Sequence, residues 1–150
     1  MTLFRTTQTI TMLCALLSAS VAYGQDTPQP VQIMPDDIKW TSLPVAPGVQ
    51  IAWLIGAADK PGFYELRVRM APGSILPPHT HPDNRHLTVL SGELYVGLGN
   101  TFEPEKTKRF PAGSFLAVPA GTVHYVLAKN GEVVFDDAAI GPTGTNWIKK

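Results

Sequence analysis

The sequence predicts an all-β protein, a single domain of antiparallel strands arranged as a sandwich or barrel. Short strand-like segments recur at close spacing, and the turns between them draw on 13 Gly and 14 Pro among 150 residues. No segment keeps a helical period, and the chain has no internal repeat. A length of 150 residues is enough to bury one core without crosslinks, so one domain is expected.

Eight segments have the residue types and turn boundaries of strands. They are residues 49–55, 63–70, 85–90, 93–98, 105–110, 114–118, 124–129 and 132–137. The segment 63–70 alternates apolar and charged residues, which predicts one buried face. We expect a hairpin at Ser91-Gly92, another at Asn130-Gly131, and an edge strand over 105–110. In the tail, Trp147 is expected to plug one end of the core.

The N-terminus has the features of a secretory signal peptide over residues 1–24. Arg5 precedes an apolar run over residues 10–22, and the small residues before Gln25 predict cleavage after Gly24. The run is shorter than the roughly 20 apolar residues that a membrane anchor needs, so we expect export to the periplasm or the medium and no stable anchor. Cys14, the only cysteine, lies in this run, so the mature chain would lack a thiol.

The remaining chain divides into an extended leader over 25–44, the domain over 45–140 and a tail over 141–150. Twelve basic side chains balance twelve acidic ones, and the basic ones are scattered along the chain. Nothing in this pattern indicates a nucleic-acid partner, and none is expected.

Three of the four histidines have the spacing of metal ligands. His79 and His81 are separated by one residue, and in an extended strand that spacing points both imidazoles to one face. His124 follows a Pro-x-Gly turn that starts a later strand. If the two strands lie together, three nitrogen donors converge and leave two or three coordination positions open for water, oxygen or substrate.

The first histidine stretch resembles the first sequence motif of the cupin superfamily. That motif is Gly, five residues, His-x-His, three or four residues, Glu, six residues, Gly. Gly73, His79, His81 and Gly92 occupy the expected positions, whereas Arg85 stands where the motif has Glu.

The second stretch resembles the second cupin motif, which is Gly, five residues, Pro-x-Gly, two residues, His, three residues, Asn. Gly113, Pro119, Gly121 and His124 match it, and Ala128 replaces the Asn. The resemblance covers about residues 45 to 140 and implies a jelly-roll barrel with an internal metal site. Cupin-like sites with three histidines carry out thiol dioxygenation with ferrous iron, and other cupins perform oxidation, decarboxylation, isomerisation or epimerisation.

Three further residues are candidates for the site. Arg85 either pairs with Asp83 at the rim or binds a carboxylate of the substrate, because a guanidinium cannot coordinate a metal. Strand alternation turns His86 away from Arg85, and a local bulge would instead make it a fourth ligand. Tyr125 is a candidate proton donor, although an aromatic residue in a strand more commonly packs in the core.

The sequence therefore predicts an exported, metal-binding protein with two alternative functions. The first is a metal-dependent enzyme, of dioxygenase or lyase type, acting on a small anionic molecule. The second is a non-catalytic module that binds a small ligand or a metal. The metal would be one divalent transition ion, and imidazole donors leave iron, manganese, nickel, copper and zinc open. A homodimer formed by exchange of a strand or of the leader suits the architecture.

Overall fold

A computed structural model describes residues 29–149, so the predicted signal peptide, its cleavage site and Cys14 lie outside the described residues. Residues 32–149 belong to one compact unit, and every strand of the described residues lies in it. The elements, in order, are η1 (Pro35–Asp37), β1 (Thr41–Ser42), β2 (Val49–Ile55), β3 (Gly62–Met70), β4 (Ile75–Thr80), β5 (Arg85–Ser91), β6 (Glu93–Leu98), η2 (Pro104–Lys106), β7 (Lys108–Pro111), β8 (Phe115–Val118), β9 (His124–Leu127), β10 (Val133–Gly141) and β11 (Asn146–Trp147). Within residues 29–149, no helix reaches the length and apolar character that crossing a membrane demands.

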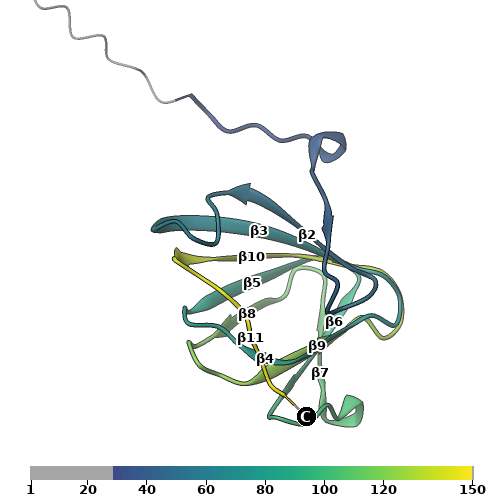
Figure 1. Ribbon diagram of the computed structural model, residues 1–150. Helices are drawn as coiled ribbons and strands as arrows, with labels where there is room; N and C mark the ends of the chain where they lie inside the picture. Colours follow the sequence, from purple (N-terminus) through teal and green to yellow (C-terminus); the bar gives the residue numbers. More distant parts are fainter. Residues whose placement is uncertain (1–28, 150) are drawn as a thin grey trace, which may run out of the picture. The chain divides into compact units, whose positions relative to one another are not determined.

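The strands form two antiparallel sheets that lie as layers (Figure 1). One sheet has the order β1-β2-β3-β10-β5-β8, and the other has the order β11-β4-β9-β6-β7. The predicted all-β class is confirmed. Of the two predicted arrangements, sandwich and barrel, the structure shows the sandwich, because the hydrogen-bonded ladders in the described part of the chain end at β1, β8, β11 and β7 without joining.

The core lies between the sheets and follows the alternation of each strand. In β3 the predicted inward residues Tyr64, Leu66, Val68 and Met70 are all buried. In β5 the inward positions begin with Arg85, and β10 places Asp137 among its inward apolar residues. Two charged side chains therefore lie among the inward residues of β5 and β10, whose other members are apolar.

Both predicted hairpins are wrong. β5 and β6 belong to different sheets, as do β9 and β10, so the turns at Ser91-Gly92 and Asn130-Gly131 carry the chain from one layer to the other. The predicted edge strand over 105–110 is shorter than expected. Its first part forms the 3-10 turn η2, and pairing with β6 begins at Lys108.

Gly92 is required at its turn for two reasons. Its φ is +75°, and a Cβ at this position would lie 2.2 Å from the carbonyl oxygen of Glu132. Gly92→Ala should therefore destabilise the fold by about 2 to 3 kcal/mol, of which about 1 kcal/mol is the left-handed backbone. Gly113→Ala is the matched control, because its φ is +85° and no atom lies within 4 Å of its Cβ. Urea denaturation that gives equal losses for both variants would contradict the close approach.

Candidate metal centre

The three predicted histidines meet between the two sheets. His79 lies near the end of β4, His81 follows that strand, and His124 begins β9. The antiparallel register places His79 directly opposite His124, which explains how residues 45 positions apart come together. All three side chains are buried, with exposed fractions of 3%, 9% and 3%. One donor nitrogen from each imidazole lies within 4.8 Å of the other two.

Backbone carbonyls hold each of these imidazoles by its Nδ1 atom. The Nδ1 of His79 lies 2.6 Å from the Pro77 oxygen, that of His81 2.8 Å from the Gly144 oxygen, and that of His124 3.0 Å from the Thr122 oxygen. A carbonyl oxygen only accepts, so each Nδ1 carries the hydrogen and each Nε2 keeps its lone pair. Metal-binding histidines are oriented in this way.

His81 has a second neighbour that is incompatible with its bond to Gly144. The Nη2 of Arg85 lies 2.9 Å from His81 Nδ1, but a guanidinium is only a donor. One nitrogen cannot donate to Gly144 and accept from Arg85 in the same tautomer. The bond to Gly144 leaves Nε2 available like those of the other two rings. Arg85 Nη2 has its own acceptor in Thr143 Oγ1, at 2.8 Å.

The imidazoles are neutral at physiological pH. Burial, followed by the neighbouring His124, lowers the pKa of His79 to about 3. Burial, followed by the positive charge of Arg85, lowers the pKa of His81 to about 4. Burial also lowers the pKa of His124. Neutral imidazole is the form that coordinates a metal, so protons do not compete for these nitrogens at pH 7.

We expect the metal-free protein to lose stability between pH 7 and pH 5. Unfolded histidine titrates at 6.5, whereas folded His79 and His81 titrate at about 3 and about 4, so the unfolded chain alone gains protons in this window. Each histidine then costs about 2 kcal/mol at pH 5. Asp137 acts in the opposite direction, because its pKa rises from 3.8 to about 6 in the folded chain. Its protonation therefore stabilises the folded chain by about 1 kcal/mol at pH 5. Urea denaturation in the presence of a chelator at pH 7 and at pH 5 measures the net change in the free energy of unfolding. Equal stability at the two pH values would contradict the predicted loss.

Arg85 is buried and holds two carboxylates. Its side chain is 4% exposed and donates from Nε to Asp83 at 3.3 Å and from Nη1 to Asp137 at 2.5 Å. Asp83 also accepts from Tyr64 Oη at 2.5 Å and from Thr143 Oγ1 at 2.7 Å. The structure shows the Asp83 pairing that the sequence offered as one alternative, but in the interior. The second carboxylate, Asp137, was not anticipated.

Asp137 is the least satisfied member of this network. Its Oδ2 accepts from Arg85, whereas Oδ1 is the one buried side-chain oxygen or nitrogen of residues 29–149 with no hydrogen-bond partner. Burial raises the pKa of this carboxyl to about 6, although the charge and hydrogen bond of Arg85 lower it. The carboxylate is therefore mostly ionised at pH 7 and has an unused acceptor.

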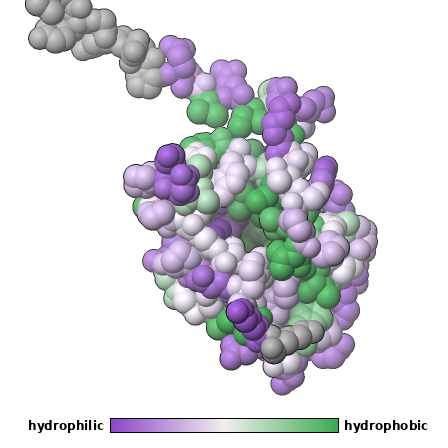
Figure 2. All heavy atoms as spheres, in the orientation of Figure 1, coloured by the Kyte–Doolittle hydropathy of each residue, from purple (hydrophilic) through white to green (hydrophobic). Residues whose placement is uncertain are grey.

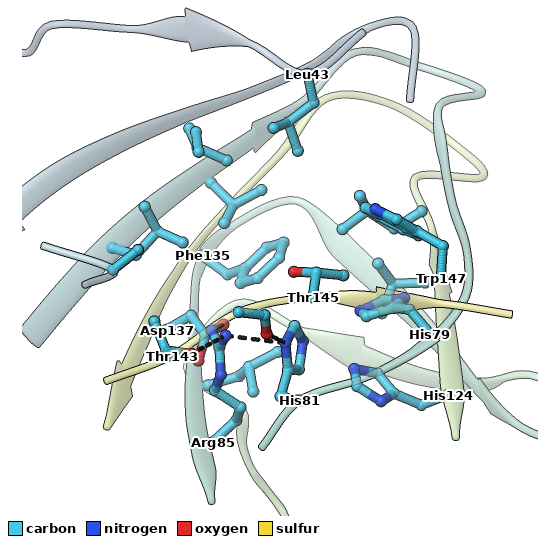
Figure 3. A pocket seen from close by; sticks show the side chains of 18 of the residues that line it. Leu43, His79, His81, Arg85, His124, Phe135, Asp137, Thr143, Thr145 and Trp147 are labelled. Carbon is cyan, nitrogen blue, oxygen red and sulfur yellow. Dashed lines mark hydrogen bonds and ion pairs between the residues drawn. The ribbon is translucent and has the colours of Figure 1, made fainter. Parts of the chain in front are cut away.

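A cavity of about 270 Å³ connects the histidines to this carboxylate. Its wall is mainly apolar, and its polar groups gather at one end (Figure 3). The lining residues are Leu43, Ile51, Trp53, Ala58, Leu66, Val68, Leu76, His79, His81, Arg85, Leu87, His124, Val126, Phe135, Asp137, Thr143, Gly144, Thr145 and Trp147. Figure 2 shows hydrophobic residues around a hollow on one face of the molecule. The cavity can hold a small organic molecule.

Two of the predicted site residues lie elsewhere. His86 is exposed on the outer face of β5 and stacks on Phe115. The register shift of β5 against β10 lies between Val89 and Ser91, so it does not turn His86 toward the other histidines. Tyr125 is fully buried, but its ring packs against Gly97 and its hydroxyl donates to the backbone oxygen of Glu103 at 3.0 Å. Alternation along β9 turns Tyr125 away from the face that carries His124.

The sequence interpretation missed several pocket residues. Trp147 was expected as a plug, and it pairs through β11 with β4, where its ring lies 5.0 Å from that of His79. The available signal for Asp137 was alternation itself, because Val133 and Phe135 share its face of β10 and a charge at that position must be buried. Nothing in the sequence identifies Thr143 or the Gly144 carbonyl, which lie in a loop.

Two antiparallel sheets that enclose three convergent histidines and an apolar cavity define a β-sandwich of the cupin class. Residues 28–137 match the family described as the ChrR Cupin-like domain, and the chain belongs to this family. The predicted resemblance is thus confirmed.

Relatives and solved structures agree with this assignment. The chain is 41% identical over 73 residues to nectarin-1 of Nicotiana langsdorffii x Nicotiana sanderae, covering 48% of this chain and 31% of nectarin-1. It is 42% identical over 60 residues to germin-like protein subfamily 2 member 2 of Arabidopsis thaliana, covering 39% of this chain and 27% of that protein. The chain therefore spans about a third or less of these relatives.

Among solved structures, a polyketide cyclase from Streptomyces resistomycificus superposes with a TM-score of 0.67 at 20% identity, over 81% of this chain and 87% of the cyclase. A recombinant oxalate oxidase in complex with glycolate superposes with a TM-score of 0.55 at 24% identity, over 71% and 57% of the two chains. At these identities the likeness shows the fold alone.

Proposed function

We propose that this protein is a metal-dependent enzyme in which His79, His81 and His124 hold one divalent transition ion next to a cavity for a small organic substrate. The observation that carries the proposal is the tethering of all three Nδ1 atoms to backbone carbonyls, which leaves three Nε2 lone pairs for one ion. A cluster of purely structural histidines would have no need for one common tautomer.

The donor set fits such an ion. Three neutral imidazoles suit iron, manganese, nickel, copper or zinc, and three ligands leave coordination positions for water, oxygen or substrate. Donor atoms about 2.1 Å from one ion lie closer together than 4.8 Å, so the rings would have to rotate inward to hold it. The bound ion would supply Lewis-acid or oxygen-binding chemistry, and the apolar wall would exclude water from it.

The reaction we propose is of dioxygenase or lyase type, on a small molecule. The anionic substrate expected from the sequence has less support, since Arg85 is the single lysine or arginine of the described cavity wall and two carboxylates already contact it. Export through cleavage after Gly24 remains part of the proposal and rests on residues 1–24 alone.

The test begins with metal analysis of the purified protein, followed by oxygen-uptake and product screens with catechols, thiols and small organic acids. About one transition ion per chain and turnover that chelation abolishes would support the enzyme. Protein that takes up no transition ion from any of the five metals would refute the metal site.

The non-catalytic binding module is the second candidate. The apolar wall of the cavity favours it, because shape alone can select a ligand there. Ligand binding without turnover, in metal-loaded protein, would distinguish the module from the enzyme. Light scattering of the same sample would test the predicted homodimer.

A further inference from the structure

Asp137 has a buried acceptor for which residues 29–149 provide no donor. Asp137 is 6% exposed, and its Oδ1 atom has no hydrogen-bond partner. A buried carboxylate oxygen without a donor is costly unless a ligand or water completes it. Asp137 also lines the cavity, so the completing group would enter from there (Figure 3).

We propose that Asp137 selects an uncharged, mainly apolar substrate that carries a hydroxyl group, and that its Oδ1 accepts the hydrogen bond of that hydroxyl. The class is that of phenols and other hydroxylated apolar molecules. This inference rests on the proposed function, because it names the substrate class of the same cavity.

The composition of the cavity supports a neutral ligand. Apolar side chains such as Leu66, Phe135 and Trp147 form most of the wall and favour an apolar body. The guanidinium of Arg85 contacts Asp83 and Asp137. Its charge is already balanced by these two carboxylates, so it attracts a further anion only weakly. A carboxylate ligand would instead meet the negative oxygen of Asp137.

The position of Asp137 also suits orientation toward the metal site. One guanidinium separates it from the histidines, since Arg85 contacts Asp137 through Nη1 and lies 2.9 Å from His81 through Nη2. A hydroxyl held by Asp137 would thus keep another atom of a small molecule near the histidine nitrogens. Asp137 is then a substrate-binding and orienting residue.

The experiment compares two neutral probes by isothermal titration calorimetry, 2-naphthol and 2-methoxynaphthalene, in which a methyl group replaces the hydroxyl hydrogen and so removes the donor. A hydrogen bond to a charged acceptor is expected to favour 2-naphthol by about tenfold or more in Kd. The anion 2-naphthoate should bind more weakly than 2-naphthol. Equal affinities for the two neutral probes, as expected if water alone satisfies Oδ1, or a preference for 2-naphthoate would overturn the proposal without any variant.

Asp137→Asn adds a test of specificity. The amide oxygen would keep the bond from Arg85 and turn its NH2 group to the cavity, so the variant should lose the preference for 2-naphthol. Asp136→Asn is the matched control, because Asp136 pairs with Arg67 on the other face of β10. It should keep the preference, and retention by Asp137→Asn would overturn the proposal.

Titrations of chelated and metal-loaded protein separate this inference from the proposed function. The preference for 2-naphthol depends on Asp137 and should persist without metal. Preference without any metal binding would refute the proposed function and leave the role of Asp137 standing. Metal binding without the preference for 2-naphthol would leave the proposed function standing and refute the role of Asp137.

Discussion

Replacing His124 with alanine is expected to reduce bound transition metal from about one ion per chain to less than about a tenth. His79 and His81 come from one stretch of chain, and His124 is the donor supplied by the strand opposite them. With only two imidazole ligands, an ion takes most of its remaining ligands from water, and its affinity for the site falls by at least an order of magnitude. Elemental analysis after equilibration with each of the five candidate metals measures the loss.

His86→Ala is the matched control for this experiment. It removes an imidazole from the exposed face of β5, stacked on Phe115, and should leave metal content unchanged. Near-ultraviolet circular dichroism must show that His124→Ala keeps its tertiary structure, because the ring of His124 lies 4.3 Å from that of His79. A folded His124→Ala protein that retains a full equivalent of metal would refute the site.

The histidine cluster was predictable from the sequence because its two signals are local. A His-x-His spacing in a strand determines one face, and a Pro-x-Gly turn determines where the next strand begins. The convergence of His79, His81 and His124 is confirmed by the 4.8 Å spread of their donor atoms. The metal itself remains a prediction.

The connections between strands were not predictable in the same way. Gly92 and Asn130-Gly131 are turn signals, and the chain does turn there, but a turn signal does not say which sheet receives the next strand. That choice depends on packing between layers, including the approach of Gly92 to the carbonyl of Glu132.

The partners of Arg85 required the structure as well. Asp83 is two residues away and was foreseen, whereas Asp137 lies 52 residues further along the chain and reaches Arg85 through the β5–β10 ladder. Alternation separates Asp136 from Asp137 and places Asp137 on the face of Val133 and Phe135, but it cannot show that this carboxylate meets Arg85 of another strand. Arg85, which stands where the cupin motif has Glu, thus pairs with a carboxylate from another strand.

Replacing Arg85 with methionine is expected to destabilise the protein by about 3 to 5 kcal/mol, because removal of one partner leaves a buried charge without compensation. Asp137 would lose the donor to its Oδ2, and Asp83 would keep only Thr143 as a donor to its Oδ1. The loss should be smaller at pH 5 than at pH 8, since a carboxyl whose pKa is already about 6 can protonate there instead of remaining a buried anion.

The loss of stability expected for Arg85→Met depends on the burial of the ion pair. A second, more exposed ion pair provides a test of this dependence. Arg67→Met breaks a pair with Asp136 whose side chains are 26% and 13% exposed, and it should cost about 1 kcal/mol, since water can reach the remaining charge. Combining Arg85→Met with Asp137→Leu removes both charges of the buried pair and should recover part of the loss, as replacement of a whole buried pair by apolar groups commonly does. Urea denaturation of the variants at pH 8 gives the comparison. A loss for Arg85→Met no larger than that for Arg67→Met would show that Arg85 does not neutralise the carboxylates of the cavity.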